Sequence, residues 1–220
     1  MLLGLISGGV PWIGVRTNRL DGEHVELLRD LANPIGIKIG PDSDAAHIAG
    51  LQEKLNPDNV PGKLTFMIRI PVDKIAAMQQ VVDAIAEHAP DSNVLYDIHE
   101  VTKTNKDAPP GLQKIRAVED IVAGVERLAN HLHVRGLRLH GVHLETIMDD
   151  SRRECVETAD QVPTHPGGVD PQLSPKQLEQ VIEGIKPHLL RPTPKELYAQ
   201  RKGNSLASND WSAVMIGTVR

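Results

Sequence analysis

Aromatic residues are scarce in this chain of 220 residues, where Phe, Trp and Tyr together make up only 2%. The hydrophobic share is nevertheless 40%, so the interior must be packed with Leu, Ile, Val and Ala. The length suits one domain, because domains usually hold roughly 100–200 residues and α/β barrels often reach about 250. We therefore expect a single aliphatic core.

The chain also lacks the features of secreted, membrane-spanning and nucleic-acid-binding proteins. Its one cysteine, Cys155, cannot form an internal disulfide, and no basic segment followed by an apolar core opens the sequence. No run of about 18 apolar residues could span a bilayer. The net charge is −5, and Lys and Arg are scattered among Asp and Glu, which disfavours nucleic acids and membranes as partners. We expect a reduced, cytoplasmic protein.

Short apolar runs alternate with longer segments whose apolar residues recur every three and four positions. The runs predict five strands: Trp12–Arg16, Ile35–Ile39, Leu64–Ile70, Val94–His99 and Gly141–Glu145. The longer segments have the period of amphipathic helices: Glu23–Leu31, Ser43–Leu55, Val72–His88, Ile115–Leu132 and Pro175–Ile185. A repeated strand–helix order implies parallel strands. We predict an α/β fold with about five βα units.

Five βα units cannot close an eight-stranded barrel, so the sheet stays open or a second subunit covers its edge. We predict a homodimer, and a monomer with an open, doubly wound sheet is the alternative. Residues 1–190 are assigned to the partial barrel and residues 191–220 to a tail. The tail ends in an apolar stretch, Trp211–Val219, which predicts a further strand that packs on its own chain or on a partner.

Ionisable residues gather where the predicted strands end, which is where chemistry collects in parallel βα folds. In chain order they are Arg16, Lys38, Arg69, Asp97, His99, His143, Glu145 and, after a Gly-Gly loop, Asp170. An imidazole and two carboxylates can hold Mg²⁺ or Mn²⁺, while Arg and Lys neutralise phosphate oxygens. The set indicates a pocket for a phosphorylated substrate. The alternative is that each charged group only forms a surface ion pair.

Several stretches of the sequence resemble class II (plant-type) DAHP synthases, which condense phosphoenolpyruvate with erythrose 4-phosphate. They are Trp12–Thr17, Leu20–Gly22, Asn33–Pro41, Leu55–Asn59, Ile68–Arg69, Gly141–Glu145 and Val169–Leu173. The resemblance covers about residues 10–185 and implies the C-terminal half of a TIM-type (β/α) barrel. It also implies that Arg16, Lys38 and Arg69 are catalytic residues that bind phosphoenolpyruvate. His99, Glu145 and Asp170 are then the metal ligands.

The sequence departs from the family pattern in ways that alter the pocket. Family members are about twice as long, and the half without a counterpart here supplies a cysteine metal ligand and the motif that receives the sugar phosphate. Val15 stands where the family has an acidic residue, and Asp97–Val101 replaces an Asp-Pro-Met-His-Gly-Asn run. The resemblance thus implies a truncated, diverged member in which ordinary DAHP synthesis is not expected from this chain alone.

Three functions are compatible with these residues, in the following order of preference. The first is a metal-dependent lyase that ionises a prenyl diphosphate, releases diphosphate and lets the carbocation cyclise, as terpene cyclases do. Trp12 and Tyr96 would stabilise the cation, and His143 would also contact substrate. The second is an aldol-type condensation of phosphoenolpyruvate with an aldehyde, with a partner chain completing the barrel. The third is a non-catalytic phosphate-binding or regulatory module.

Overall fold

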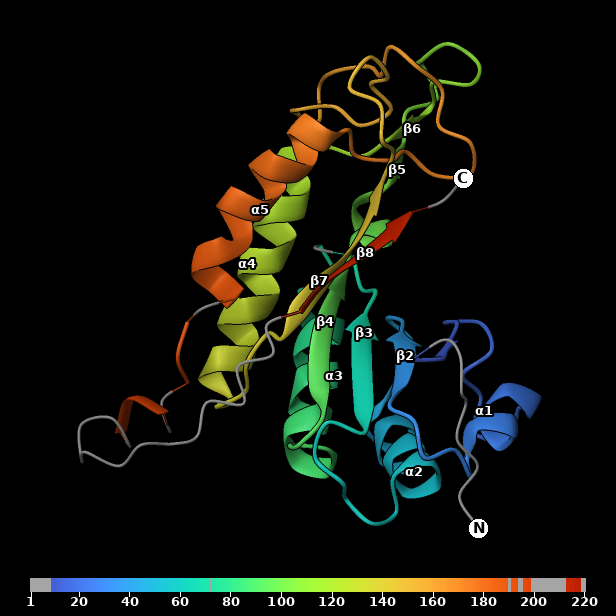
Figure 1. Ribbon diagram of the computed structural model, residues 1–220, viewed down its shortest axis with the longest axis vertical. Coiled ribbons are helices and arrows are strands. Elements are labelled where there is room, and N and C mark those ends of the chain that lie inside the picture. Colours follow the sequence, from blue (N-terminus) through green and yellow to red (C-terminus); the bar gives the residue numbers. More distant parts are fainter. Residues whose placement is uncertain (1–8, 72, 190, 194–195, 199–212, 219–220) are drawn as a thin grey trace.

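The computed structural model describes residues 9–71, 73–189, 191–193, 196–198 and 213–218. Within these residues, six parallel strands form one sheet in the order β1-β2-β3-β4-β7-β8. Their bounds are β1 Trp12–Ile13, β2 Ile35–Ile39, β3 Leu64–Ile68, β4 Asn93–Asp97, β7 Gly141–Thr146 and β8 Ala213–Thr218. The sheet curls into part of a barrel (Figure 1). The predicted truncated TIM-type barrel is therefore confirmed.

Helices follow most of the strands and lie along the convex face of the sheet (Figure 1). They are α1 Glu23–Leu28, α2 Ala45–Leu55, α3 Ile75–His88, α4 Val118–Val134 and α5 Pro175–Leu189. The Asp44 carboxylate caps α2 by accepting a hydrogen bond from the His47 N–H at 2.8 Å. Ser174 precedes α5 and its hydroxyl accepts from the Gln177 N–H, which confirms the predicted start of this helix at Ser174 and Pro175.

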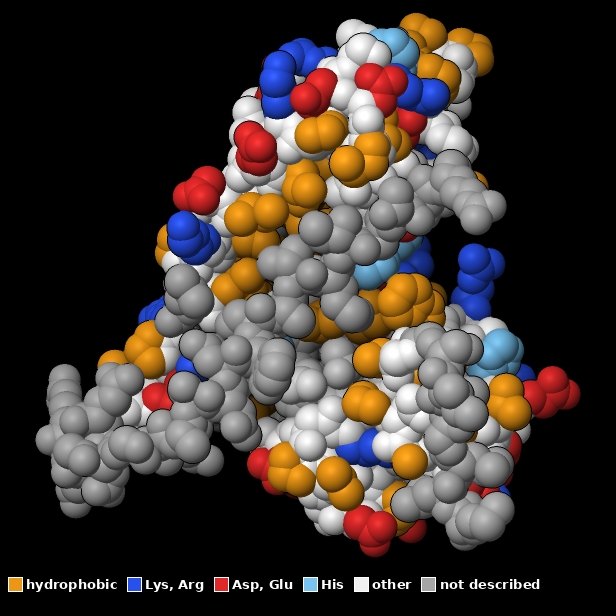
Figure 2. Space-filling model, in the orientation of Figure 1, with side chains coloured by type: hydrophobic (Ala, Val, Ile, Leu, Met, Phe, Trp, Pro, Cys, Tyr) orange, Lys and Arg blue, Asp and Glu red, His pale blue; other side chains and the backbone are white. Residues whose placement is uncertain are grey.

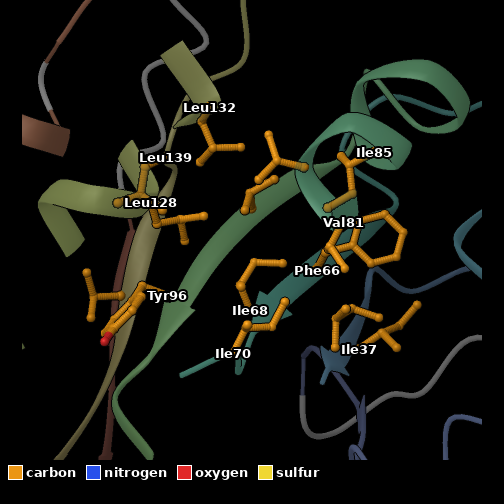
Figure 3. Packing of buried hydrophobic residues seen from close by; sticks show 14 of the residues in the cluster. Ile37, Phe66, Ile68, Ile70, Val81, Ile85, Tyr96, Leu128, Leu132 and Leu139 are labelled. Atoms are coloured by element: carbon orange, nitrogen blue, oxygen red, sulfur yellow. The ribbon is translucent and has the colours of Figure 1, made fainter. Parts of the chain in front are cut away.

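The face of the sheet toward the helices is aliphatic. Its buried residues include Ile37, Phe66 and Ile68, which pack against Val81 and Ile85 of α3 (Figure 3). Side chains alternate between the two faces along each strand, so every second residue joins this core. Burial of this apolar surface is the main stabilising term, at roughly 25 cal/mol per Å².

The other side of the sheet, which we call the inner face, is polar toward the carboxyl ends of the strands. The ladder pairs Lys38 with Met67 and Asp97 with His143, and paired residues of parallel strands share a face. Trp12 lies on the same face, since its side chain approaches the position that a Cβ on Gly36 would occupy, beside Met67. The inner face is thus the interior side of the partial barrel.

Several predicted boundaries need correction, since β1 ends at Ile13 before Arg16 and β3 ends at Ile68 before Arg69. The helix predicted from Ile115 begins only at Val118, because Lys114–Ile115 forms β6, which pairs antiparallel with β5 (Lys103–Thr104). His99 does not lie in a strand but in η1 (Ile98–Val101), where the Asp97 carboxylate caps the His99 N–H. The predicted terminal strand is observed as β8 and pairs with β7 of the same chain, while Trp211 and Val219 lie outside the described residues.

Charged side chains of both signs are mixed on the surface that Figure 2 shows. They lie at the end of the molecule that carries β5, β6 and the long loop after β7, and also along α5 and at the opposite end (Figures 1 and 2). Among the described residues, no helix is long and apolar enough to cross a membrane.

Candidate active site

The predicted site residues come together at the carboxyl edge of the sheet. Since all strands of the sheet are parallel, the ends of β1, β2, β3, β4 and β7 meet at one edge. Asp97 ends β4, His143 and Glu145 lie in β7, and Asp170 lies in the loop that follows β7. Segments far apart in sequence therefore contribute to one cluster.

Asp97 is the centre of this cluster and is fully buried. One carboxylate oxygen lies 2.9 Å from the Lys38 ammonium nitrogen. The other lies 2.5 Å from His99 Nδ1 and 3.5 Å from His143 Nδ1. Burial alone would raise the pKa of Asp97, but hydrogen bonds from His143 and His99 and the charge of Lys38 hold that pKa well below its usual range. Asp97 therefore stays ionised and fixes three cationic or imidazole groups.

The other ring nitrogen of His99 faces two carboxylates. Nε2 lies 2.9 Å from Glu145 Oε1 and 3.9 Å from Asp170 Oδ2. Burial would lower the pKa of His99, but hydrogen bonds to Asp97 and Glu145 raise it above the usual value. Burial would likewise raise the pKa of Glu145, yet His99 and Arg116 lower it to about 2. The three groups form a compact set of one nitrogen and two oxygen donors.

Lys114 of β6 and Arg116, the residue directly after it, are two cations that pair with Asp170 and Glu145. Each pairs with the carboxylate oxygen that does not face His99. Arg116 has no exposed surface, and its Nη1 donates to Glu145 Oε2 at 3.1 Å and to the carbonyl oxygen of Pro171. Its Nε donates to Thr102 Oγ1 at 2.9 Å. Lys114 lies 2.9 Å from Asp170 Oδ1. The inner oxygens of Glu145 and Asp170 are therefore directed toward His99.

This donor set fits a divalent cation. The potential ligand atoms of His99, Glu145 and Asp170 lie within 4.8 Å of one another, and imidazole with carboxylate is a suitable ligand set for Mn²⁺, Mg²⁺ and related ions. Asp97 holds the far ring nitrogen of His99, as an outer carboxylate does in many metal sites. A second potential set, Asp97, His99 and His143, shares His99, and its Asp97 also pairs with the Lys38 ammonium group.

The remaining predicted residues surround this cluster. Trp12, His143 and His99 form a row of rings with centroid separations of 5.4 and 5.8 Å. The Arg69 Nε lies 3.8 Å from Glu100. Arg16 follows β1 and is exposed, and within the described residues its side chain makes no ion pair or hydrogen bond. Lys38, His143 and His99 thus all contact Asp97, while Arg16 and Arg69 lie at the rim of the sheet.

Tyr96 does not belong to this site, which corrects the expectation that it contacts substrate. Its ring lies in the helix-side core beside Leu128 and Leu139 (Figure 3), and its hydroxyl is directed at Gly124 of α4. Burial raises the pKa of the phenol. The reason is strand alternation, because Asp97 points to the inner face and its neighbour must point away.

Sequence reasoning missed three residues that shape the site: Arg116, Lys114 and Glu154. Glu154 is buried and accepts hydrogen bonds from Arg152 at 2.9 Å and from the Gln172 N–H at 3.2 Å. The alternation of Lys114, Ile115 and Arg116 was a usable signal, since it places both cations on one side of a short strand. No comparable pattern marks Glu154.

Comparison with known proteins identifies the family. Residues 5–182 match the class-II DAHP synthetase family. The phospho-2-dehydro-3-deoxyheptonate aldolase of Streptomyces coelicolor is 32% identical over 158 residues, which cover 71% of this chain and 34% of the relative. The protein of that name in Neurospora crassa is 29% identical over 201 residues, 89% of this chain and 41% of its own length. The chain spans less than half of each relative. Since the match extends over most of the chain, this protein belongs to the class-II DAHP synthetase family.

Proposed function

We propose that this chain supplies the phosphoenolpyruvate- and metal-binding part of a DAHP-synthase-type active site, which condenses phosphoenolpyruvate with an aldehyde. The observation that carries the proposal is the placement of His99 Nε2 between Glu145 and Asp170 at the carboxyl edge of the sheet. Its family relatives are named as aldolases of this kind.

The homodimer remains a prediction, which sedimentation of the purified protein tests.

The chemistry balances without a redox partner. C3 of phosphoenolpyruvate forms a bond to the aldehyde carbon, and the carbonyl oxygen becomes a hydroxyl. Water adds at C2, the bond from C2 to the phosphate oxygen breaks, and inorganic phosphate leaves a keto group behind. One proton of the water goes to the new hydroxyl and the other leaves with phosphate.

The roles of the residues follow from their charges and places. His99, Glu145 and Asp170 would hold the divalent ion, which when bound polarises a carbonyl oxygen. Lys38 has N–H donors beyond the one that meets Asp97, and with Arg16 and Arg69 it would bind the phosphate and carboxylate of phosphoenolpyruvate. His143 lies between Trp12 and His99 and would contact the same substrate.

The prenyl diphosphate hypothesis has no such support. The relatives bear names of aldolases, and of the two aromatic residues expected to stabilise a carbocation, Tyr96 lies in the core. Diphosphate release from geranyl or farnesyl diphosphate by the metal-loaded chain would revive that hypothesis. Binding of phosphoenolpyruvate with no turnover in the presence of any aldehyde would instead favour the non-catalytic module.

Calorimetric titration of the full chain with Mn²⁺ and then phosphoenolpyruvate tests the proposal. We expect Mn²⁺ to bind, and Glu145→Gln and Asp170→Asn to weaken Mn²⁺ binding by at least about tenfold. Asp149→Asn is the matched control, because the Asp149 carboxylate accepts hydrogen bonds from Ser151 in an exposed turn and belongs to neither potential metal set among the described residues. Equal metal affinity in all three variants would remove the proposed ligand set. Turnover is then assayed as phosphate release.

A further inference from the structure

A hollow of about 660 Å³ opens beside the proposed metal ligands. His99, Glu145 and Asp170 form one side of it, and Ile147, Met148 and Val169 from the loop after β7 contribute apolar surface. The apolar side chains are not covered by the described chain, since Met148 is 84% exposed and Val169 is 78% exposed. The hollow therefore joins a polar end to an apolar mouth.

The charges around the hollow disfavour a phosphorylated ligand. Of the residues that line it, Arg152 alone carries a guanidinium or ammonium group. That guanidinium is held at 2.9 Å by the buried carboxylate of Glu154, so it is neutralised. Glu154 adds a third carboxylate to those of Glu145 and Asp170. The other two carboxylates are paired as well, Glu145 with Arg116 and Asp170 with Lys114. Apart from the divalent ion, a phosphate placed here would therefore meet no unpaired cation of the lining and would compete with a carboxylate for each paired one.

One neutral polar group completes the lining. Gln172 is buried, and its backbone N–H donates to Glu154. Within the described residues its side-chain amide makes no hydrogen bond, although it lies at the hollow. An amide can donate to a carbonyl oxygen or accept from a hydroxyl, which suits an uncharged oxygen-bearing ligand.

We propose that this hollow binds the second substrate, and that this substrate is an uncharged aldehyde with an apolar chain in place of a sugar phosphate. The inference rests on the proposed condensation. The carbonyl end would lie toward the metal ligands and Gln172, and the chain toward Met148 and Val169. C3 of phosphoenolpyruvate then bonds to the aldehyde carbon, water adds at C2, and the bond from C2 to the phosphate oxygen breaks. The products are a 4-hydroxy-2-keto acid with an apolar tail and inorganic phosphate.

Binding can be measured separately from turnover by saturation-transfer NMR on the Mg²⁺-loaded full chain. The probes are hexanamide, an unreactive analogue of hexanal, and erythrose 4-phosphate. We expect hexanamide to bind at least about tenfold more tightly than the sugar phosphate, since its chain removes apolar surface from water. Equal or tighter binding of erythrose 4-phosphate, or no binding of hexanamide, overturns the proposal.

Matched variants locate the binding site. Met148→Gln and Val169→Thr keep the side-chain size but add polarity at the mouth, and each should weaken hexanamide binding roughly threefold to tenfold. Val134→Thr is the control, because Val134 at the end of α4 is 79% exposed and does not line the hollow. If Val134→Thr weakens binding as much as Val169→Thr, the ligand does not occupy this hollow.

The same samples distinguish the failure of this inference from the failure of the proposed function. Phosphoenolpyruvate is titrated beside hexanamide. Binding of phosphoenolpyruvate together with erythrose 4-phosphate, but not hexanamide, keeps the condensation and refutes the apolar acceptor. Binding of hexanamide without phosphoenolpyruvate keeps the pocket but refutes the condensation. With hexanal as co-substrate, phosphate release that exceeds the release with erythrose 4-phosphate would extend the binding result to turnover.

Discussion

The helix-covered side of the sheet and its inner face use alternate residues of the same strands. Histidines at the two ends of the sheet nevertheless differ in pKa. His140, at the amino end of β7, accepts a hydrogen bond from the Val94 N–H at 3.1 Å. Burial, with the nearby charge of Arg138, lowers the pKa of His140 to about 4. His99, at the carboxyl edge, has a raised pKa because Asp97 and Glu145 outweigh its burial. The surroundings of each histidine therefore decide whether its ring is charged.

This contrast teaches how stability and chemistry are divided in the molecule. The helix side is apolar and contributes stability by burial, whereas the inner face gathers charges that largely compensate one another. Buried ion pairs add little net stability, because removing charges from water costs nearly what their attraction returns. The charged cluster is therefore better explained by a binding role than by folding.

The largest effect is expected from Phe66→Ala, which breaks the helix side alone. Loss of a fully buried phenyl ring should lower the free energy of unfolding by roughly 3–5 kcal/mol and leave Mn²⁺ affinity of the folded protein unchanged. Urea unfolding and calorimetry measure the two quantities. Leu27→Ala, at an exposed position of α1, should change stability by less than about 0.5 kcal/mol. A parallel loss of metal affinity in Phe66→Ala would contradict the division.

The next largest effect on the free energy of unfolding is expected from a fall in pH, which protonates His140. Its pKa in the folded protein lies below the ordinary value of 6.5, so folding favours the neutral ring. Stability from this group is full above about pH 6.5 and falls as the pH drops toward 4, by up to about 3 kcal/mol. Urea unfolding across this range should show a smaller loss in His140→Asn. His24→Asn, at an exposed site of α1, should retain the parent's profile; a flattened profile there would discount the assignment.

Arg116→Met changes the inner face alone and tests whether Arg116 positions the proposed metal ligands. The Glu145 carboxylate and the Pro171 carbonyl lose their shared donor, so Mn²⁺ affinity should fall roughly 10–100-fold. Arg116→Lys should recover part of it, since it restores charge without the planar fork. Arg135→Met removes a surface pair with Asp83 and serves as control. Full metal affinity in a folded Arg116→Met protein would show that Arg116 does not position the ligands.

The smallest effect is expected from Glu154→Gln, which frees Arg152 at the hollow while keeping an acceptor for the Gln172 N–H. Binding of erythrose 4-phosphate, measured by saturation-transfer NMR, should improve roughly threefold to tenfold, because the guanidinium is half exposed and screened by solvent. Asp83→Asn frees Arg135 elsewhere on the surface and should change nothing. No improvement with Glu154→Gln would mean that the Arg152–Glu154 pair does not exclude phosphate.

Much of the fold could be predicted from local pattern. The apolar runs at Ile35–Ile39 and Gly141–Glu145 appear as β2 and β7 almost residue for residue, because a buried parallel strand is a short, continuous apolar run. The convergence of Lys38, His99 and Glu145 followed from strand order alone, since parallel strands end at one edge. The burial of Tyr96 on the helix side also follows from strand alternation, because its neighbour Asp97 points to the inner face.

The rest depends on contacts between distant segments. Arg116 meets Glu145 across 29 residues of sequence and Pro171 across 55, and nothing near Arg116 announces either partner. Glu154 is comparable, because its pairing with Arg152 looks like a surface pair until the fold buries its carboxylate. The partners of Arg116 and the burial of Glu154 could therefore not be predicted from composition or spacing.

The row of rings formed by Trp12, His143 and His99 gives the protein an optical reporter. Trp12 is one of two tryptophans in the chain, and its ring meets His143 edge-on at 5.4 Å. Because Trp12 is 49% exposed, a ligand or an ion that enters beside His143 should change the polarity around the indole. A Trp211→Phe protein would then report occupancy of the candidate active site by fluorescence, without a label and without turnover.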